Sequence, residues 1–340
     1  MNQTSIRRLL IENLADRYLP KLQFDPNRSI RNLVDMGECL SNGKTQKRFF
    51  RSAQKLLEKE NSPYYALIRR IISQCDPRTI KTFGMNLGFH SWLSLSGRKR
   101  PEAAPPWTMM FQMEKSADAL SLDELTALLR QSVEAGIHTF LFWLDRSYDA
   151  LDELTARLKG FSDCAFALFS SAEQISPDVL DHAQQTHNIL LSLNDSPGED
   201  PEPVTRALRD RRCPYALHTV YSTPSEAEHI LCGKWLERVS RLLSPFAFFF
   251  PGASCPEESH TAVREYARTL RTAPQQPVFS MSLCDDIADV DELISGKPRL
   301  LRIRSNGTLA SGSRLAETDS SLQISLSDLL ARYAAALPAS

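Results

Sequence analysis

From Trp107 onward, short apolar runs alternate with amphipathic stretches. The runs have the length and the β-branched and aromatic content of buried strands, and the stretches have helical spacing of apolar positions. Six such strand–helix units follow one another, about 25–30 residues apart, which is typical of right-handed βαβ crossovers and a parallel sheet. The expected strands are Trp107–Met113, Thr139–Leu144, Ala165–Phe169, Asn188–Leu193, Tyr215–Tyr221 and Phe246–Phe250.

The intervening stretches predict helices at Ser121–Ala135, Tyr148–Leu158, Pro177–Thr186, Glu202–Arg211, Ser225–Leu243 and Pro256–Arg271. Two of them begin with a capping-box pattern, Ser121 with Glu124 and Ser225 with Glu228. A closed eight-strand barrel takes about 250 residues, so six units favour a curved sheet or partial (βα)6 TIM-like barrel.

The chain divides by pattern into four parts. Residues 1–95 read as a helical N-terminal region, and residues 96–106 (SGRKRPEAAPP) as a linker with glycine, prolines and a charge run. Residues 107–275 hold the strand–helix units. Residues 276–340 form a C-terminal extension with two more strand-like pieces, Val278–Ser282 and Leu300–Arg304, and a last helix.

Composition and charge narrow the class of protein. With 42% hydrophobic and 24% charged residues the chain has an ordinary globular composition. No apolar run approaches the ~20 residues of a membrane span, and no signal-peptide core is present, so we expect a cytoplasmic protein without a transmembrane segment. Residues 1–106 hold 19 Lys+Arg against 9 Asp+Glu, and the remainder holds 21 against 32. This charge asymmetry fits solvated helix faces or a patch for an acidic partner. The basic stretches are not interspersed with aromatic residues, as they are in proteins that bind single-stranded nucleic acid, so nucleic acid is not an expected partner.

The seven cysteines argue against a conventional metal or redox motif. No two lie within four residues of each other, whereas zinc ribbons and iron–sulfur sites use close pairs. An acidic cluster, Asp285-Asp286 with Asp289, Asp291 and Glu292, has irregular spacing and favours a solvated loop over a cation site.

Polar side chains at or near the strand ends mark the candidate site. The carboxyl ends of parallel strands meet at one edge of a sheet or barrel, which is where ligands bind. The residues expected to ring this mouth are Glu114, Asp145, Arg146, Ser170, Ser192, Asn194 and His218. They fit a hydrated mouth or a pocket for a peptide or small polar ligand. His218 is a pocket residue if its face points inward and otherwise a hydrogen-bonded structural histidine.

In order, these strand ends form a series that resembles the radical SAM superfamily, in the branch with a helical N-terminal region and a SPASM or twitch-type C-terminal extension. The likeness covers most of the chain. It lies in RTIKTFGMNLGFHSWLSLSGRKR before the barrel, LSLDELTALLRQSVEAGIHTFLF after the first strand, SLND, Pro251-Gly252 and IRSNGTL. The resemblance implies a partial barrel that binds a [4Fe–4S] cluster and SAM.

Each motif that would hold those cofactors is altered. The CxxxCxxC loop is replaced by MEKSADA (113–119), the GGEP motif by 144–147 (LDRS) and the threonine-asparagine-glycine element by 170–172 (SSA). Asp195 stands where the family has a glycine, and Gly312 lies about where an auxiliary-cluster cysteine is expected. The sequence therefore predicts no [4Fe–4S] cluster and no SAM, hence no cofactor, no catalytic residue and no metal ligand.

Three hypotheses follow for function. The leading one is a catalytically inactive radical SAM-like protein that is a partner or scaffold of an active radical SAM enzyme, or a recognition module for its peptide substrate. The second is an iron-independent enzyme, SAM-binding or another transferase, that uses the altered barrel mouth. The third is a structural homo-oligomer formed through the helical N-terminal part.

Overall fold

The structure is a computed structural model of the whole chain. It describes residues 24–40, 44–90, 105–272, 276–295, 300–311 and 326–335, with a few single positions before residue 24. The predicted linker 96–106 lies almost wholly outside these residues, as does the position of Gly312.

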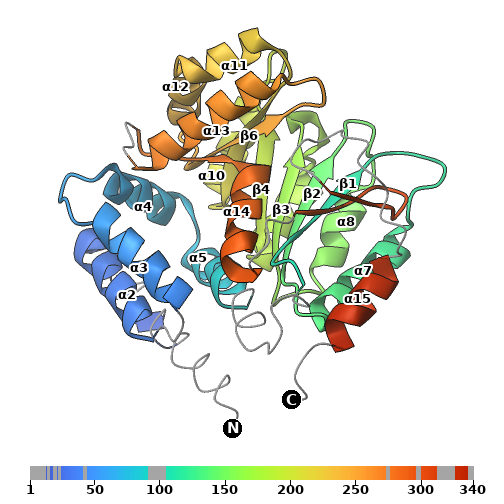
Figure 1. Cartoon of the computed structure of the whole chain (residues 1–340), viewed down its shortest axis with the longest axis horizontal. Helices are drawn as coiled ribbons and strands as arrows, with labels where there is room; N and C mark the ends of the chain where they lie inside the picture. Colours follow the sequence, from blue (N-terminus) through green and yellow to red (C-terminus); the bar gives the residue numbers. More distant parts are fainter. Residues whose placement is uncertain are drawn as a thin grey trace.

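One curved sheet organises the described part of the chain (Figure 1). Its strands follow the order β7-β6-β5-β4-β3-β2-β1-β8-β9; β1 to β8 are parallel and β9 runs antiparallel to β8. The bounds are β1 Met109–Met113, β2 Thr139–Leu144, β3 Ala165–Ser170, β4 Ile189–Asn194, β5 Tyr215–Tyr221, β6 Phe246–Pro251, β7 Phe279–Ser282, β8 Leu301–Ile303 and β9 Leu309–Ser311. The α/β class and the partial TIM-like barrel predicted from the sequence are confirmed. The two further strand-like pieces predicted at Val278–Ser282 and Leu300–Arg304 are also confirmed, as β7 and β8, and they extend the same sheet at its two sides.

Helices cover the outer, convex face of the sheet. They are α7 Leu122–Glu134, α8 Leu151–Leu158, α9 Pro177–Thr186, α10 Glu202–Asp210, α11 Pro224–Leu231, α12 Lys234–Arg241 and α13 Glu257–Thr272. The capping box of Ser121 with Glu124 is confirmed. The single helix predicted at Ser225–Leu243 is two helices, because Gly233 between them adopts a left-handed backbone with φ of 81°. The first of the two is capped by Thr223 with Glu226, so the predicted box at Ser225 and Glu228 is wrong.

Strand alternation separates two hydrophobic cores. Every second strand residue, such as Phe142, Leu168 and Leu193, packs against the outer helices. The strand residues that alternate with these form a second cluster on the concave face, which includes Leu141, Phe169 and Phe250. The two faces of the sheet are therefore both apolar along most of the strand length, as expected of a parallel sheet covered on both sides.

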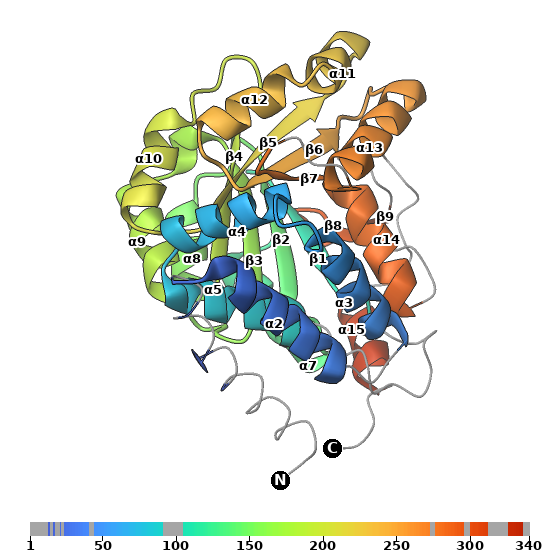
Figure 2. The same ribbon diagram turned by 90° about the vertical axis from the view of Figure 1, so that its left-hand side faces the viewer.

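The N-terminal helices dock on the amino-terminal rim of the half-barrel (Figure 2). They are α2 Pro26–Leu40, α3 Lys44–Leu56, α4 Pro63–Gln74, α5 Pro77–Gly84 and the π-helical turn η1 Met85–His90. Their contacts go to loops that precede strands: Arg70 Nη1 to Ser244 O at 3.3 Å, Thr79 Oγ1 to His187 Nδ1 at 2.8 Å and Asn86 Nδ2 to Cys164 O at 2.7 Å. This arrangement leaves the carboxyl ends of the strands uncovered by α4 and α5.

The acidic cluster predicted as a solvated loop lies on a partly buried helix, α14 Leu283–Ser295. Asp285, Asp286 and Asp291 are buried. Asp286 pairs with Arg271 of α13, and Asp291 Oδ1 accepts from Trp107 N at 3.1 Å. The apolar side of α14 packs onto the concave face, where Leu283, Cys284 and Ile287 join its hydrophobic cluster. The helix thus spans from the β7 side of the sheet to the start of β1.

The remaining C-terminal helix, α15 Leu326–Ala335, packs beside α7 and contributes Leu326 and Leu330 to the outer core. Among the described residues, none of the helices has both the length and the apolar character to cross a membrane.

Gly252, directly after β6, allows a close approach of two strand ends. A Cβ at this position would lie 2.0 Å from Ser222 Oγ and 3.2 Å from Ser222 Cβ. We expect Gly252→Ala to lower the free energy of unfolding by about 1–3 kcal/mol through overpacking. Gly84→Ala is the matched control, because its Cβ would meet no heavy atom within 4 Å. Urea denaturation of both variants measures the difference. Equal stability of the two would contradict the prediction, and a Ser222→Ala background should lessen the loss at Gly252.

Candidate functional site

The concave face carries a layer of aromatic side chains near the carboxyl ends of the strands. Trp143, Phe169 and Phe250 come from β2, β3 and β6, and His218 of β5 lies among them. The ring centroids of Trp143 and Phe250 are 4.8 Å apart, and those of Phe169 and Phe250 are 5.1 Å apart. The His218 ring lies 5.2 Å from Trp143 and 5.5 Å from Phe169, edge to face in both cases. This layer covers the concave face near the carboxyl ends of β2, β3 and β6 with ring contacts.

His218 is a buried, neutral member of that layer. Its exposed fraction is 2%, and its Nδ1 lies 3.1 Å from the hydroxyl of Ser192, which is fully buried on the neighbouring strand. Burial lowers the pKa of His218 to about 3, because the charged imidazolium would lose its hydration among the rings. His218 and Ser192 therefore both point to the concave face. The interpretation of His218 as a pocket residue required this orientation, but the imidazole is packed among aromatic rings.

The upper rim of the same face holds the charged residues of the predicted site. Glu114 accepts a hydrogen bond from Ser305 Oγ at 3.1 Å. Asp145 accepts from Ser147 N at 2.8 Å, and the hydrogen bonds from Ser147 lower the pKa of its carboxyl group. These two side chains belong to the ends of adjacent strands and have their own local partners.

A polar network joins the β2 end to the β4 end. Arg146 forms an ion pair with Glu199, whose side chain is only 3% exposed. Asn194 donates to the same Glu199 carboxylate at 3.3 Å and accepts from Ser196 Oγ at 2.8 Å. The structure therefore brings Arg146 and Asn194 to one acidic group that the sequence did not single out.

Ser170 lies apart from the other predicted site residues. It pairs in register with Leu193, which belongs to the outer core, so strand alternation directs its side chain to the convex face. It is buried, and among the described residues its hydroxyl has no hydrogen-bond partner. Its neighbour Ser171 shares the orientation of Phe169 but forms a capping box with Gln174 of the following turn.

The residues at the mouth do not fit a [4Fe–4S] cluster. A cluster takes about four cysteine thiolates, or three plus a small ligand, converging on one point. The turn after β1, residues 114–120, contains no cysteine. Cys164 and Cys213 lie before β3 and β5, at the opposite rim, and burial raises the pKa of Cys213 to about 12. Cys284 is buried in α14 with a pKa likewise raised by burial to about 12.

One group of metal-type ligands lies at the amino-terminal rim. His138, Asp163 and Cys164 precede β2 and β3, and their ligand atoms all lie within 4.8 Å of one another. The carboxylate of Asp163 is 3.5 Å from His138 Nδ1 and 3.8 Å from Cys164 Sγ. Burial raises the pKa of the Cys164 thiol, which disfavours the thiolate that a metal would need. This rim is the side on which the N-terminal helices dock.

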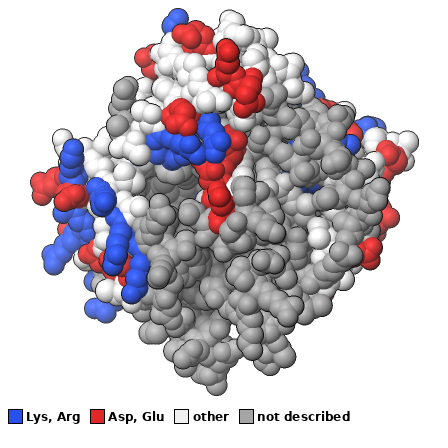
Figure 3. All heavy atoms as spheres, viewed as in Figure 1, with Lys and Arg blue, Asp and Glu red and all other residues white. Residues whose placement is uncertain are grey.

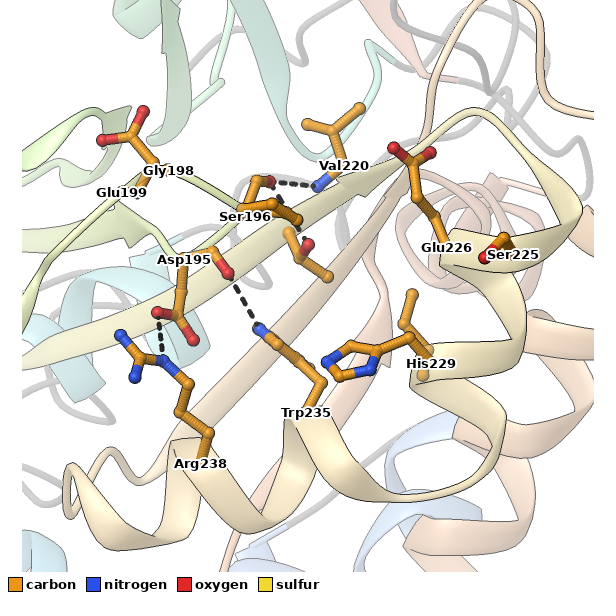
Figure 4. Close-up of a pocket in the computed structure, with 13 residues that line it drawn as sticks. Asp195, Ser196, Gly198, Glu199, Val220, Ser225, Glu226, His229, Trp235 and Arg238 are labelled. Carbon is orange, nitrogen blue, oxygen red and sulfur yellow. Dashed lines mark hydrogen bonds and ion pairs between the residues drawn. The ribbon is translucent and has the colours of Figure 1, made fainter.

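A pocket that sequence reasoning missed lies at the carboxyl ends of β4 and β5 (Figure 4). Its volume is about 480 Å³, and it is bounded by the turn after β4 and by α11 and α12. The lining includes Asp195, Ser196, Glu199, Glu226, His229, Trp235 and Arg238. Arg238 Nε donates to Asp195 Oδ1 at 2.7 Å, and Trp235 Nε1 donates to the Asp195 carbonyl at 3.3 Å. The sequence signal for this pocket is Asp195, an acidic residue directly after an apolar strand. The family resemblance explains Asp195 only as the replacement of a glycine.

Fold and site together define a curled α/β half-barrel with a layer of aromatic side chains on its concave face. Solved structures with a similar fold include SuiB of Streptococcus suis bound to the precursor peptide SuiA (13% identity, TM-score 0.49, covering 67% of this chain and 65% of that one). Another is SuiB bound to S-adenosylmethionine (15% identity, TM-score 0.47, 67% and 64%). A third is 3-dehydroquinate dehydratase of Geobacillus kaustophilus (12% identity, TM-score 0.39, 67% and 90%).

The aligned part of the chain covers just under two thirds of SuiB in the first two of these comparisons. Likeness at this level concerns the fold alone, and the fold class rests on the strands themselves. No family model and no curated protein matches the chain.

Proposed function

We propose that this chain is a non-catalytic, radical SAM-like half-barrel that acts by binding. Its partner is an active radical SAM enzyme or that enzyme's peptide substrate. The observation that carries the proposal is the aromatic layer of Trp143, Phe169, His218 and Phe250 on the concave face, together with α14 packed onto the same face. An enzyme of this architecture needs that face open for a cluster, SAM and a substrate.

The electrostatics of the mouth support the same proposal. The charged groups at the upper rim have partners within the chain: Arg146 with Glu199, and Glu114 with Ser305. The neutral His218 offers no positive charge for the carboxylate of a ligand. These features suit a structural core below a hydrated rim.

A charged surface away from the mouth supports a binding role. Figure 3 shows Lys and Arg side chains gathered on the side where α2 and α3 lie. Lys47, Arg51 and Lys55 of α3 are exposed there. A basic surface of this kind attracts an acidic partner and increases the rate of association at low ionic strength.

Anaerobic reconstitution with iron and sulfide tests the absence of a cluster. We expect well below one iron per chain after desalting and no charge-transfer absorption, because thiolates do not converge at the mouth. A Cys39→Ser/Cys232→Ser variant removes the two exposed thiols and is the control for adventitious iron. An authentic radical SAM enzyme treated in parallel is the positive control. About four irons per chain, retained in the double variant, would overturn the proposal.

Two further measurements separate the alternatives. Calorimetric titration with SAM is expected to show no binding; tight binding without iron would favour an iron-independent enzyme instead. Light scattering of the full chain mixed with an active radical SAM enzyme is expected to show a joint complex that weakens with salt. A chain that forms only its own oligomers, with no joint complex, would favour the structural hypothesis.

A further inference from the structure

The pocket at the ends of β4 and β5 contains a buried carboxylate with unused hydrogen-bonding capacity. The Asp195 side chain is 1% exposed. Its Oδ1 accepts from Arg238, whereas its Oδ2 has no hydrogen-bond partner among the described residues. In Figure 4 the carboxylate points from the strand end toward Arg238 of α12, with Trp235 beside it. A buried carboxylate oxygen without a donor is costly, and native proteins usually supply one.

The charges around this pocket favour a cation as the missing donor. The lining contributes three carboxylates, from Asp195, Glu199 and Glu226, whereas Arg238 in the lining and Arg146 beside it contribute two guanidinium groups. Glu226 is held at the start of α11 by the amide of Ser222 at 2.7 Å, and Glu199 is held by Arg146. The capacity left for a ligand therefore lies at Asp195, in surroundings with one carboxylate more than guanidinium groups.

The walls of the pocket suit an aliphatic stem behind that cation. Val220, Ile230 and Trp235 line it together with the polar groups. Ile230 and Trp235 are almost fully buried, with exposed fractions of 3% and 2%. A volume of about 480 Å³ lies within the range of roughly 300–1,000 Å³ that small-molecule and side-chain pockets occupy.

We propose that this pocket binds a primary amine or guanidinium carried on an aliphatic chain, with Asp195 Oδ2 as the acceptor. The basic side chain of a peptide and a free aliphatic amine share this chemistry. Charge-assisted hydrogen bonds to a carboxylate are the strong class, and desolvation in a pocket strengthens them further. The site is separate from the concave face, and its proposal stands whether or not the chain proves catalytic.

The test is an NMR titration of the full chain, observed at the Trp235 indole N–H. That N–H donates to the Asp195 carbonyl and is an immediate reporter; a Trp235→Phe spectrum assigns it. The probes are N-acetyl-lysine methylamide for a peptide side chain, agmatine for a free amine, and N-acetyl-norleucine methylamide as the uncharged isostere. We expect saturable shifts with one or both of the cationic probes and none with the isostere; the cation that binds identifies the source.

Asp195→Asn should weaken the binding of the cationic probe at least tenfold. Asp200→Asn is the matched control, since Asp200 is exposed nearby and outside the lining, and should change it less than threefold. Equal shifts with norleucine and lysine derivatives, no shift with either cation, or unchanged binding by Asp195→Asn would each overturn the proposal. If Asp195→Asn does not fold, the proposal is decided by the native chain alone, from the shifts that the lysine derivative causes compared with those of the norleucine derivative.

Discussion

Replacing Arg271 with alanine is expected to lower the free energy of unfolding by about 3–5 kcal/mol at pH 7. Its guanidinium binds both oxygens of Asp286 at 2.7 Å and the carbonyl of Ser280 at 3.0 Å. Asp286 is 9% exposed, and burial raises the pKa of its carboxyl group, while the charge of Arg271 opposes that rise. Removing the arginine leaves the Asp286 carboxylate buried without its counter-ion. An uncompensated buried charge destabilises the folded state strongly.

Arg268→Ala is the matched control, one helical turn earlier on α13. Arg268 is 40% exposed and pairs with Asp289, and such solvent-screened pairs contribute about 0–1 kcal/mol. Urea denaturation of the two variants and of Arg271→Ala/Asp286→Ala isolates the interaction. The double variant should recover part of the loss, because it removes the stranded carboxylate as well. Equal losses for Arg271→Ala and Arg268→Ala would show that α14 is not held in this way.

The same pair has a consequence for the concave face. Arg271 and Asp286 hold α14 beside α13, and Trp107 Nε1 donates to the Ile287 carbonyl at 3.3 Å at the other side of the sheet. Between these two attachments α14 packs onto the concave hydrophobic cluster. Arg271→Ala should therefore also loosen that cover, and faster hydrogen exchange along α14 than along α7 would report it.

The strands could be predicted because their signal is local. Apolar runs bounded by turns placed β2 and β5 at their exact ends. Side-chain direction at the strand ends depends on the register, and one residue changes the face: Ser170 points outward while Ser192 and Asn194 point inward. A polar residue at the end of an apolar run carries no mark of its register, so Ser170 could not be separated from the others by composition.

The acidic residues of α14 and the pocket were not predictable, because their partners are distant in sequence. An Asp-rich stretch suggests solvent exposure unless the arginines of α13 are known to face it. Asp195 likewise lines a pocket only because Arg238 and Trp235 of α12, about forty residues later, form hydrogen bonds to it. The prediction of one helix over Ser225–Leu243 gave no indication of that contact, because α12 begins only after the break at Gly233.

Acid is expected to destabilise the fold through His218, by up to about 5 kcal/mol. The pKa of His218 is about 3 in the folded chain, against the ordinary value of 6.5. The unfolded chain binds the proton first as the pH falls, so this contribution to stability is fully present above pH 6.5. It is lost progressively between pH 6.5 and pH 3, with about 2 kcal/mol lost at pH 5.

The measurement is the difference in pH dependence between the native chain and His218→Phe/Ser192→Ala. The phenylalanine keeps the ring contacts with Trp143 and Phe169, and the alanine removes the hydroxyl that would lose its partner. Urea midpoints from pH 7 to pH 4 should fall less steeply in this variant, while His229→Gln, at an exposed position, should follow the native chain. Parallel curves for all three would mean that water reaches His218, and the concave face would then have room for a ligand. The steepness of this curve therefore tests whether the concave face around His218 is a packed core or an open site.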